Sequence, residues 1–254
     1  MITEATASDA SRRVDRTGRS GFWVAVTTAV LAATACASAI TTPPRTGPYC
    51  RSNCLAFPYA GGAAFVPRDF WWMYPESLVA LLAVVLIAGL SRRAGPGAAS
   101  SGRASTILAA IAAGVLVSDY ALQLTVVQPS LLKGEGDGLA LLSQYNPHGV
   151  FIGLENVGYL LFGLAFLGAG AAMEAASRLL RAARAAFMVG GAATVVALVG
   201  YAAVYGVDFE YRFEVAGIGI DWLVFLVTGI LLALDARHRP GRSSATESMD
   251  PTVR

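Results

Sequence analysis

Residues 71–90 read WWMYPESLVALLAVVLIAGL, a run of 20 residues in which Glu76 is the only charged side chain. A helix needs about 20 apolar residues to cross the hydrocarbon layer of a membrane. This stretch therefore predicts a membrane-spanning helix that carries one carboxylate near its start. An ionised acid at the centre of a span costs about 2.5–3.5 kcal/mol on insertion scales, so such residues usually face the interior of the protein.

The same apolar pattern recurs along the chain. The predicted spans cover residues 21–42, 71–90, 106–128, 150–172, 185–205 and 215–234. Only 14% of the 254 residues are charged, whereas soluble domains carry about 25%. We therefore expect an all-α polytopic membrane protein, a six-transmembrane-helix bundle over residues 21–236 with disordered cytoplasmic tails at 1–20 and 237–254. Pro129 is expected to close the third span, because proline disfavours continued helix.

The positions of the basic residues predict the orientation in the membrane. Cytoplasmic loops carry an excess of Lys and Arg. Of the 19 basic residues, 14 fall before the first span, between spans two and three, between spans four and five, or after the sixth. Both termini are therefore expected in the cytoplasm, and the alanine- and arginine-rich composition indicates a bacterial plasma membrane. The net charge of +2, without a basic stripe interleaved with aromatics, does not indicate nucleic-acid binding.

The first predicted span has two interpretations. Arginines, an apolar run from Phe22 and then Ala33-Thr34-Ala35-Cys36 are similar to a lipoprotein signal that ends at a lipidated cysteine. Ala33 stands where such a signal has Leu, and the apolar run continues to Ile40. An uncleaved span is therefore favoured over a signal cleaved at residues 1–35, with Cys36 as a small buried residue.

Two further cysteines, Cys50 and Cys54, fall in the first predicted extracytoplasmic loop, where disulfides persist. A disulfide that clamps the loop is favoured over a redox or metal-binding role. Two thiolates make an incomplete zinc site, and the nearest imidazole candidate, His148, belongs to another loop. The sequence therefore predicts neither a metal nor a cofactor.

Acidic residues also interrupt three other predicted spans, at Asp119, Glu155 and Asp221. With the predicted orientation, these acids and Glu76 lie roughly 8–14 Å below the extracytoplasmic surface. Residues four apart share a helix face, which pairs Asp119 with Gln123 and Glu155 with Tyr159. We therefore predict an outward-facing acidic pocket. Its candidate residues are Glu76, Asp119, Gln123, Glu155, Asn156, Tyr159, Asp221 and Arg212.

Such a pocket would bind, and could transport, a small cationic or protonatable solute. The first alternative is a non-catalytic membrane assembly or accessory protein, in which the acids are structural and pair with Arg68 and Arg212. The second is an enzyme that modifies a lipid with a pair of carboxyl groups as general acid and base. An enzyme is less favoured, because the sequence has no Ser-His pairing, no H-E-x-x-H motif and no phosphate-binding glycine motif. The sequence does not fix the oligomeric state.

Several strings of residues carry a resemblance to a known group of proteins. They are Asp119-Tyr120, residues 128–132 (QPSLL), residues 142–149 (LSQYNPHG), residues 154–159 (LENVGY) and residues 205–214 (YGVDFEYRFE). In this order they resemble a group of uncharacterised bacterial multi-span membrane proteins, over residues 49–235. The resemblance implies a six-helix membrane architecture. It implies no mechanism, because no activity is assigned to that group.

Overall fold

The computed structural model describes residues 2–92 and 94–238, with side chains from residue 19 onward. Six helices are long and apolar enough to cross a membrane. These six spans correspond to α1 (Ile2–Ile40), α2 (Met73–Ser91), α3 (Ala99–Leu122), α6 (Val150–Ala172), α7 (Arg178–Tyr205) and α8 (Tyr211–Arg237). The described ranges contain no strand, so the predicted all-α bundle of six membrane-spanning helices is confirmed.

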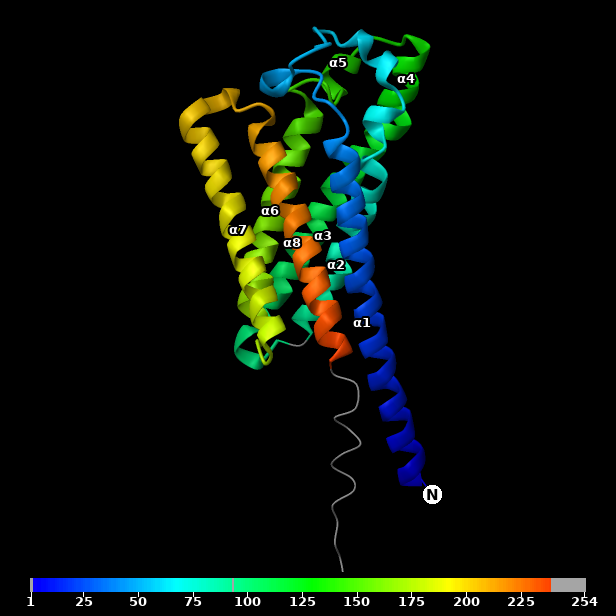
Figure 1. The fold of residues 1–254 in the computed structure, drawn as a ribbon, viewed down its shortest axis with the longest axis vertical. Coiled ribbons are helices and arrows are strands. Elements are labelled where there is room, and N and C mark those ends of the chain that lie inside the picture. The colour runs from blue at the N-terminus through cyan, green and yellow to red at the C-terminus, as the bar shows by residue number, and fades with distance from the viewer. Residues whose placement is uncertain (1, 93, 239–254) are drawn as a thin grey trace, which may run out of the picture.

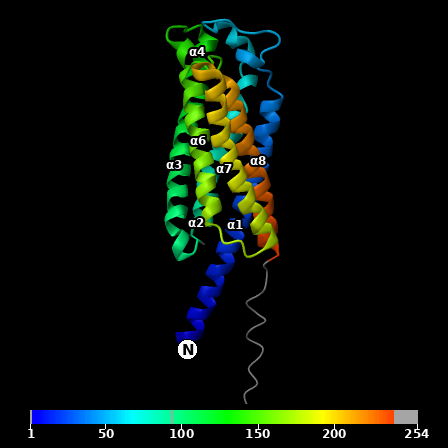
Figure 2. The same cartoon turned by 90° about the vertical axis from the view of Figure 1, so that its left-hand side faces the viewer.

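The six long helices form a ring in which each packs against two neighbours. The order around the ring is α1, α2, α3, α6, α7 and α8, and α8 packs against α1 to close it. α6 also contacts α8 and α2 across the interior. Figures 1 and 2 show the helices side by side along the long axis of the molecule. α6 is therefore the helix through which interior groups from different spans can meet.

The long connections lie at the end of the bundle opposite the start of α1 (Figure 1). The first, residues 41–72, contains η1 (Gly47–Tyr49), η2 (Ala60–Phe65) and η3 (Arg68–Phe70). The second, residues 134–149, contains α5 (Leu139–Leu142). η6 (Gly206–Asp208) joins α7 to α8 at this same end, whereas η4 (Pro96–Ala98) joins α2 to α3 at the other. We call the end with the long connections the loop end.

The structure describes most of the predicted N-terminal tail but only the first two residues of the predicted C-terminal tail. α1 continues back to Ile2, so helical backbone occupies the segment at 1–20 that we expected to be disordered. This segment contains three Ala and four Arg, which favour helix, and its only glycine is Gly18. Residues 239–254 of the predicted C-terminal tail lie outside the described residues, as does Arg93.

The third span does not end at Pro129 as predicted. The helix passes from α3 through η5 (Gln123–Val127), a π-helical segment, into α4 (Gln128–Lys133). In a regular α-helix, a proline ring clashes with the carbonyl four residues earlier. A wider π turn ahead of Pro129 relieves this clash, and π turns are frequent at functional sites. The prediction was wrong because it assumed regular α-helical geometry around the proline.

α1 and α8 approach closely through small residues. Ala25, Ala29, Ala32 and Ala35 are buried along one face of α1, three or four residues apart. On α8, a Cβ atom added to Gly229 would lie 2.7 Å from the carbonyl oxygen of Ala25. Helices in a bilayer gain much of their packing from such close backbone approach. The α1–α8 contact therefore requires glycine at position 229.

We expect Gly229→Val to separate α1 from α8 and to destabilise the protein by about 1–3 kcal/mol, the usual cost of overpacking. The change is measured as a lower midpoint of thermal unfolding in detergent. Gly200→Val on α7 is the matched control, because a Cβ atom there meets no atom within 4 Å. Equal midpoints for the two variants would contradict this account of the α1–α8 contact.

Candidate functional site

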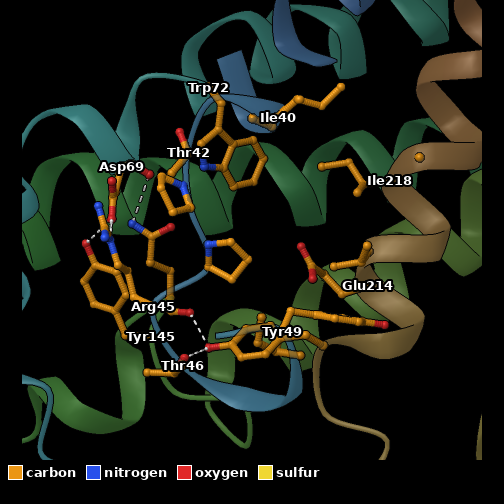
Figure 3. A pocket seen from close by; sticks show the side chains of 18 of the residues that line it. Ile40, Thr42, Arg45, Thr46, Tyr49, Asp69, Trp72, Tyr145, Glu214 and Ile218 are labelled. Atoms are coloured by element: carbon orange, nitrogen blue, oxygen red, sulfur yellow. Dashed lines mark hydrogen bonds and ion pairs between the residues drawn. The ribbon is translucent and has the colours of Figure 1, made fainter. Parts of the chain in front are cut away.

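A cavity of about 470 Å³ lies at the loop end of the bundle, between the end of α1 and the starts of α6 and α8. Most of its wall is apolar and includes Ile40, Trp72, Phe151, Ile218 and Trp222. Figure 3 shows the side chains around the central space, with Trp72 and Ile218 among those that face it. The volume lies within the range of small-molecule sites, which is about 300–1,000 Å³.

One side of the cavity carries a buried ion pair. Arg45 Nε lies 3.0 Å from Asp69 Oδ2, and the Arg45 guanidinium lies 3.6 Å from the centre of the Phe65 ring. The Tyr145 hydroxyl donates to the same Asp69 oxygen at 3.3 Å. Burial, with the Asp69 charge beside it, raises the pKa of Tyr145, so the hydroxyl stays a donor at neutral pH. The charge of Arg45 is therefore balanced within the cavity wall.

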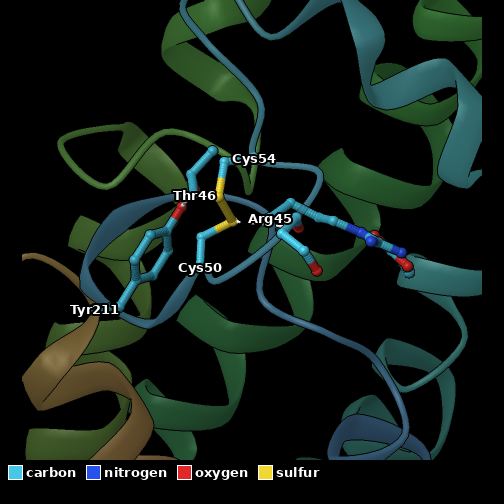
Figure 4. Close-up of a disulfide and its surroundings, with 7 residues drawn as sticks. Arg45, Thr46, Cys50, Cys54 and Tyr211 are labelled. Carbon is cyan, nitrogen blue, oxygen red and sulfur yellow. Dashed lines mark hydrogen bonds and ion pairs between the residues drawn. A yellow bond between two sulfur atoms is a disulfide. The ribbon is translucent and has the colours of Figure 1, made fainter.

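The loop that carries Arg45 is closed on itself by covalent and hydrogen bonds. A disulfide joins Cys50 to Cys54, the candidate pair from the sequence (Figure 4). The backbone N–H of Leu55 donates to the carbonyl of Arg45 at 2.7 Å. The disulfide closes residues 50–54, and the hydrogen bond joins the two ends of residues 45–55. Together these links fix the position of the Arg45 backbone.

A second set of hydrogen bonds ties the two long connections to α8 (Figure 4). The hydroxyls of Thr46 and Tyr211 lie 2.6 Å apart, and Tyr211 donates to the carbonyl of Gln144 at 3.0 Å. Because Tyr211 has one hydroxyl hydrogen, Thr46 must be the donor in the first of these bonds. Gln123 in η5 accepts from the Gln144 N–H at 3.0 Å and donates to the Leu142 carbonyl. Gln123 therefore positions a loop and does not line the cavity.

Glu214 is the other charged residue on the cavity wall. It belongs to the first turn of α8, and Figure 3 shows it across the cavity from Asp69 and Tyr145. Among the described residues, no ion pair involves Glu214. Its carboxyl group is in hydrogen-bond contact with that of Glu155 on α6. The cavity wall thus carries one carboxyl group without a cationic partner.

Glu155 belongs to a buried cluster with two tyrosines. Its Oε1 lies 3.0 Å from the hydroxyl of Tyr120 on α3 and 3.0 Å from that of Tyr159 on α6. The two hydroxyls lie 2.6 Å from each other. α8 packs closely here, since a Cβ atom on Gly217 would lie 2.9 Å from Tyr159 Cβ. The cluster therefore joins α3, α6 and α8 directly behind the cavity wall.

Three more acids from the predicted set are buried in the interior. Asp119 and Asp221 are each 1% exposed, and within the described ranges neither carboxylate has a hydrogen-bond donor. Glu76 accepts a hydrogen bond of 2.5 Å from the indole N–H of Trp222, which lines the cavity. Burial of an ionised carboxylate without a donor is costly. A proton or a bound cation is therefore needed to balance each of the two aspartates.

The structure divides the candidate residues from the sequence into separate groups. Buried behind the cavity wall, and not forming it, are Glu76, Asp119, Glu155, Tyr159 and Asp221. Asn156 is half-buried, and its Oδ1 has no partner among the described residues. Arg212 lies 3.6 Å from Glu210 and 4.1 Å from the centre of the Tyr205 ring. Arg212 therefore pairs within its own segment and with none of the intramembrane acids.

The sequence placed Glu214, with Asp208 and Glu210, over the same end of the bundle but did not include this acid of the cavity wall among the candidate residues. It precedes Asp221 by seven residues, a spacing that places both on one face of α8. This spacing was the available signal. It was weak because Glu214 sits at the start of the helix, where charged residues are common and do not interrupt an apolar run.

Comparisons of this chain with protein-family models, curated proteins and solved structures find no match. Within residues 2–92 and 94–238, no three His, Cys, Asp or Glu residues are grouped so as to hold a metal ion. The function is therefore argued from the cavity and its carboxyl groups.

We expect Asp69→Ala to destabilise the protein by about 3–5 kcal/mol, because it leaves the Arg45 charge buried without a partner. The measurement is the free energy of unfolding, or the thermal midpoint, in detergent. The matched control is Glu210→Ala, which removes a more exposed ion pair worth about 0–1 kcal/mol. If both variants lost the same stability, the Arg45–Asp69 pair would not be a structural element of the cavity wall.

Proposed function

We propose that this integral membrane protein binds a small organic cation, or a solute that becomes cationic by protonation, in the cavity between α1, α6 and α8, and that it transports this solute. One observation carries the proposal. The cavity combines a mostly apolar wall with a single carboxyl group, Glu214, that has no cationic partner among the described residues. An apolar body with one positive charge matches such a wall.

Aromatic side chains add to this complementarity. Trp72, Trp222 and Tyr49 line the cavity together with Glu214. The faces of aromatic rings attract cations, by about 0.5–1 kcal/mol when exposed and more when water is excluded. A cation near Glu214 would therefore meet favourable electrostatic contacts from both the carboxylate and the rings.

The accessory-protein alternative predicted that Arg68 and Arg212 neutralise the intramembrane acids. Arg68 instead donates to the carbonyl of Thr41 at 2.7 Å, and Arg212 pairs with Glu210. Neither arginine therefore forms the ion pairs that this alternative requires. Asp119 and Asp221 also lack hydrogen-bond donors among the described residues, and unpaired buried polar groups are costly, so these two acids do not act as architectural ion pairs.

The basic residues place the cavity on the outer side of the membrane in our proposal. The cavity lies at the loop end, which carries the minority of the basic residues, and both termini then lie in the cytoplasm of a bacterial cell. A solute would therefore reach the cavity from outside the plasma membrane.

The orientation is tested by labelling single cysteines in intact cells. In a variant without Cys36, Cys50 and Cys54, we expect Gly136→Cys at the loop end to react with a membrane-impermeant maleimide. Glu174→Cys, between α6 and α7, should react only after the cells are permeabilised. The reverse pattern would place the cavity on the cytoplasmic side.

Binding is tested with benzyltrimethylammonium and its uncharged isostere neopentylbenzene. The fluorescence of Trp72 and Trp222 in the cavity wall reports binding to the purified protein in nanodiscs. We expect the cation to bind, and Glu214→Gln to weaken its binding about tenfold or more, which corresponds to about 1.4 kcal/mol or more. Glu210→Gln, which changes an acid of the same segment outside the cavity wall, should bind as the wild type does.

Two results would count against this function. One is equal binding of the cation to wild type and Glu214→Gln, which would show that the carboxylate does not recognise charge. The other is equal affinity for benzyltrimethylammonium and neopentylbenzene, which would show that the cavity selects shape alone.

A further inference from the structure

The carboxyl groups of Glu155 on α6 and Glu214 on α8 are in hydrogen-bond contact. Ionised carboxylates only accept hydrogen bonds, so such a contact has a donor only when one of the two groups carries a proton. Two ionised groups in contact would also repel each other strongly in an interior of low dielectric constant. The contact therefore calls for one positive charge between the two carboxyl groups.

The hydrogen bonds around Glu155 point the same way. Its Oε2 is fully buried and has no donor within the described part of the chain. Its Oε1 contacts the hydroxyls of both Tyr120 and Tyr159, and these hydroxyls also contact each other, so three short contacts share only two hydroxyl hydrogens. An unpartnered buried oxygen beside the carboxyl group of the cavity wall that has no ion-pair partner among the described residues marks a site for a proton or a cation.

The titratable groups around the pair are Asp119 and Tyr120 from α3, Tyr159 from α6, Tyr211 from α8 and Tyr49 from the first long connection, each of which is neutral or negative. The cations of this neighbourhood are Arg212, whose charge acts on Tyr49, and Arg45 on the cavity wall. Arg212 pairs with Glu210 and Arg45 with Asp69. In the described residues, no Arg, Lys or His forms an ion pair with Glu155 or Glu214.

We propose that Glu155 and Glu214 share one proton when the cavity is empty and release it when a cationic ligand binds. The protonated Glu155–Glu214 pair and the free cation become the doubly ionised pair with the bound cation, and one proton passes to the water of the cavity. No bond of the ligand forms or breaks. The net charge of the site, one negative charge, is the same before and after the exchange.

The geometry gives the reason for the exchange. The shared proton offsets the repulsion between the two carboxylates, and a cation beside Glu214 offsets the same repulsion. Glu214 lines the cavity, so a ligand in the cavity meets this member of the pair, whereas Glu155 is fully buried and does not line the cavity. The inference rests on the proposed binding of a cation and adds that proton and cation compete for one site.

The exchange is tested by the pH dependence of benzyltrimethylammonium binding in nanodiscs. Release of one proton per ligand makes the association constant rise about tenfold per pH unit over the range where the pair holds its proton. Calorimetric titrations in buffers of different ionisation enthalpy count the released protons directly. We expect about one proton per ligand for the wild type and for the control Glu210→Gln.

Glu155→Gln removes the shared proton without removing the hydrogen bond. The amide N–H of the substituted side chain can donate to the Glu214 carboxylate, and the amide oxygen can still accept from the two tyrosines. We expect this variant to bind the cation with no proton release and with an affinity that does not change with pH over the same range. Infrared spectra provide a second readout that needs no binding of the variant. Wild type should show a carboxylic-acid C=O band that disappears when the cation is added, and Glu155→Gln should lack this band.

The outcomes separate the two proposals. Cation binding to wild type with no proton release, a flat pH profile or no carboxylic-acid band that responds to ligand overturns the exchange and leaves the binding function intact. Retention of the pH slope in Glu155→Gln also overturns it, because the proton would then belong to another group. Absence of cation binding to wild type at every pH overturns both proposals.

Discussion

The contact between the carboxyl groups of Glu155 and Glu214 links the cavity to the interior of the bundle. This contact is possible because α6 packs against α8 in the interior of the bundle, and because Gly217 allows α8 to approach Tyr159 closely. Glu214 alone would be an ordinary acid at a helix start. With Glu155 behind it, the same carboxyl group becomes the member of a pair that faces the cavity, and repulsion between two ionised carboxylates favours a positive charge between them.

Part of this arrangement could be predicted from the sequence. Hydropathy is a local property, so six apolar runs suffice to predict six spans, and Glu155 and Asp221 stand out because they interrupt such runs. The depth of the acids follows from counting residues along each helix. What counting cannot supply is the direction of each side chain around its helix. The acids were therefore expected to form the cavity wall, whereas they lie behind it.

Three contacts of the structure could not be predicted from the sequence, for identifiable physical reasons. Arg212 was grouped with the acids because it is close to them in depth, yet it pairs with Glu210, two residues away. A contact between near neighbours in the chain has a smaller entropic cost than a contact with a residue on another helix. Gln123 follows Asp119 by one regular helical turn, but its amide bonds to Leu142 and Gln144 of the second long connection, a contact that depends on the fold of that connection. Arg45 and Asp69 are 24 residues apart, and their pairing depends on the fold of the first long connection.

Charge balance distinguishes the two sides of the cavity in the proposed binding of a cation. Arg45 and Asp69 neutralise each other, and hydrogen bonds from Tyr145 and the loop hold them in place, so a ligand that displaced either one would leave a buried charge unpaired. Glu214 has no such partner among the described residues, and its carboxyl group already shares its environment with Glu155. A cation can therefore take the position beside Glu214 without breaking an ion pair. In the proposed exchange, the proton is the only charge that the cation displaces, and its departure leaves the net charge of the site unchanged.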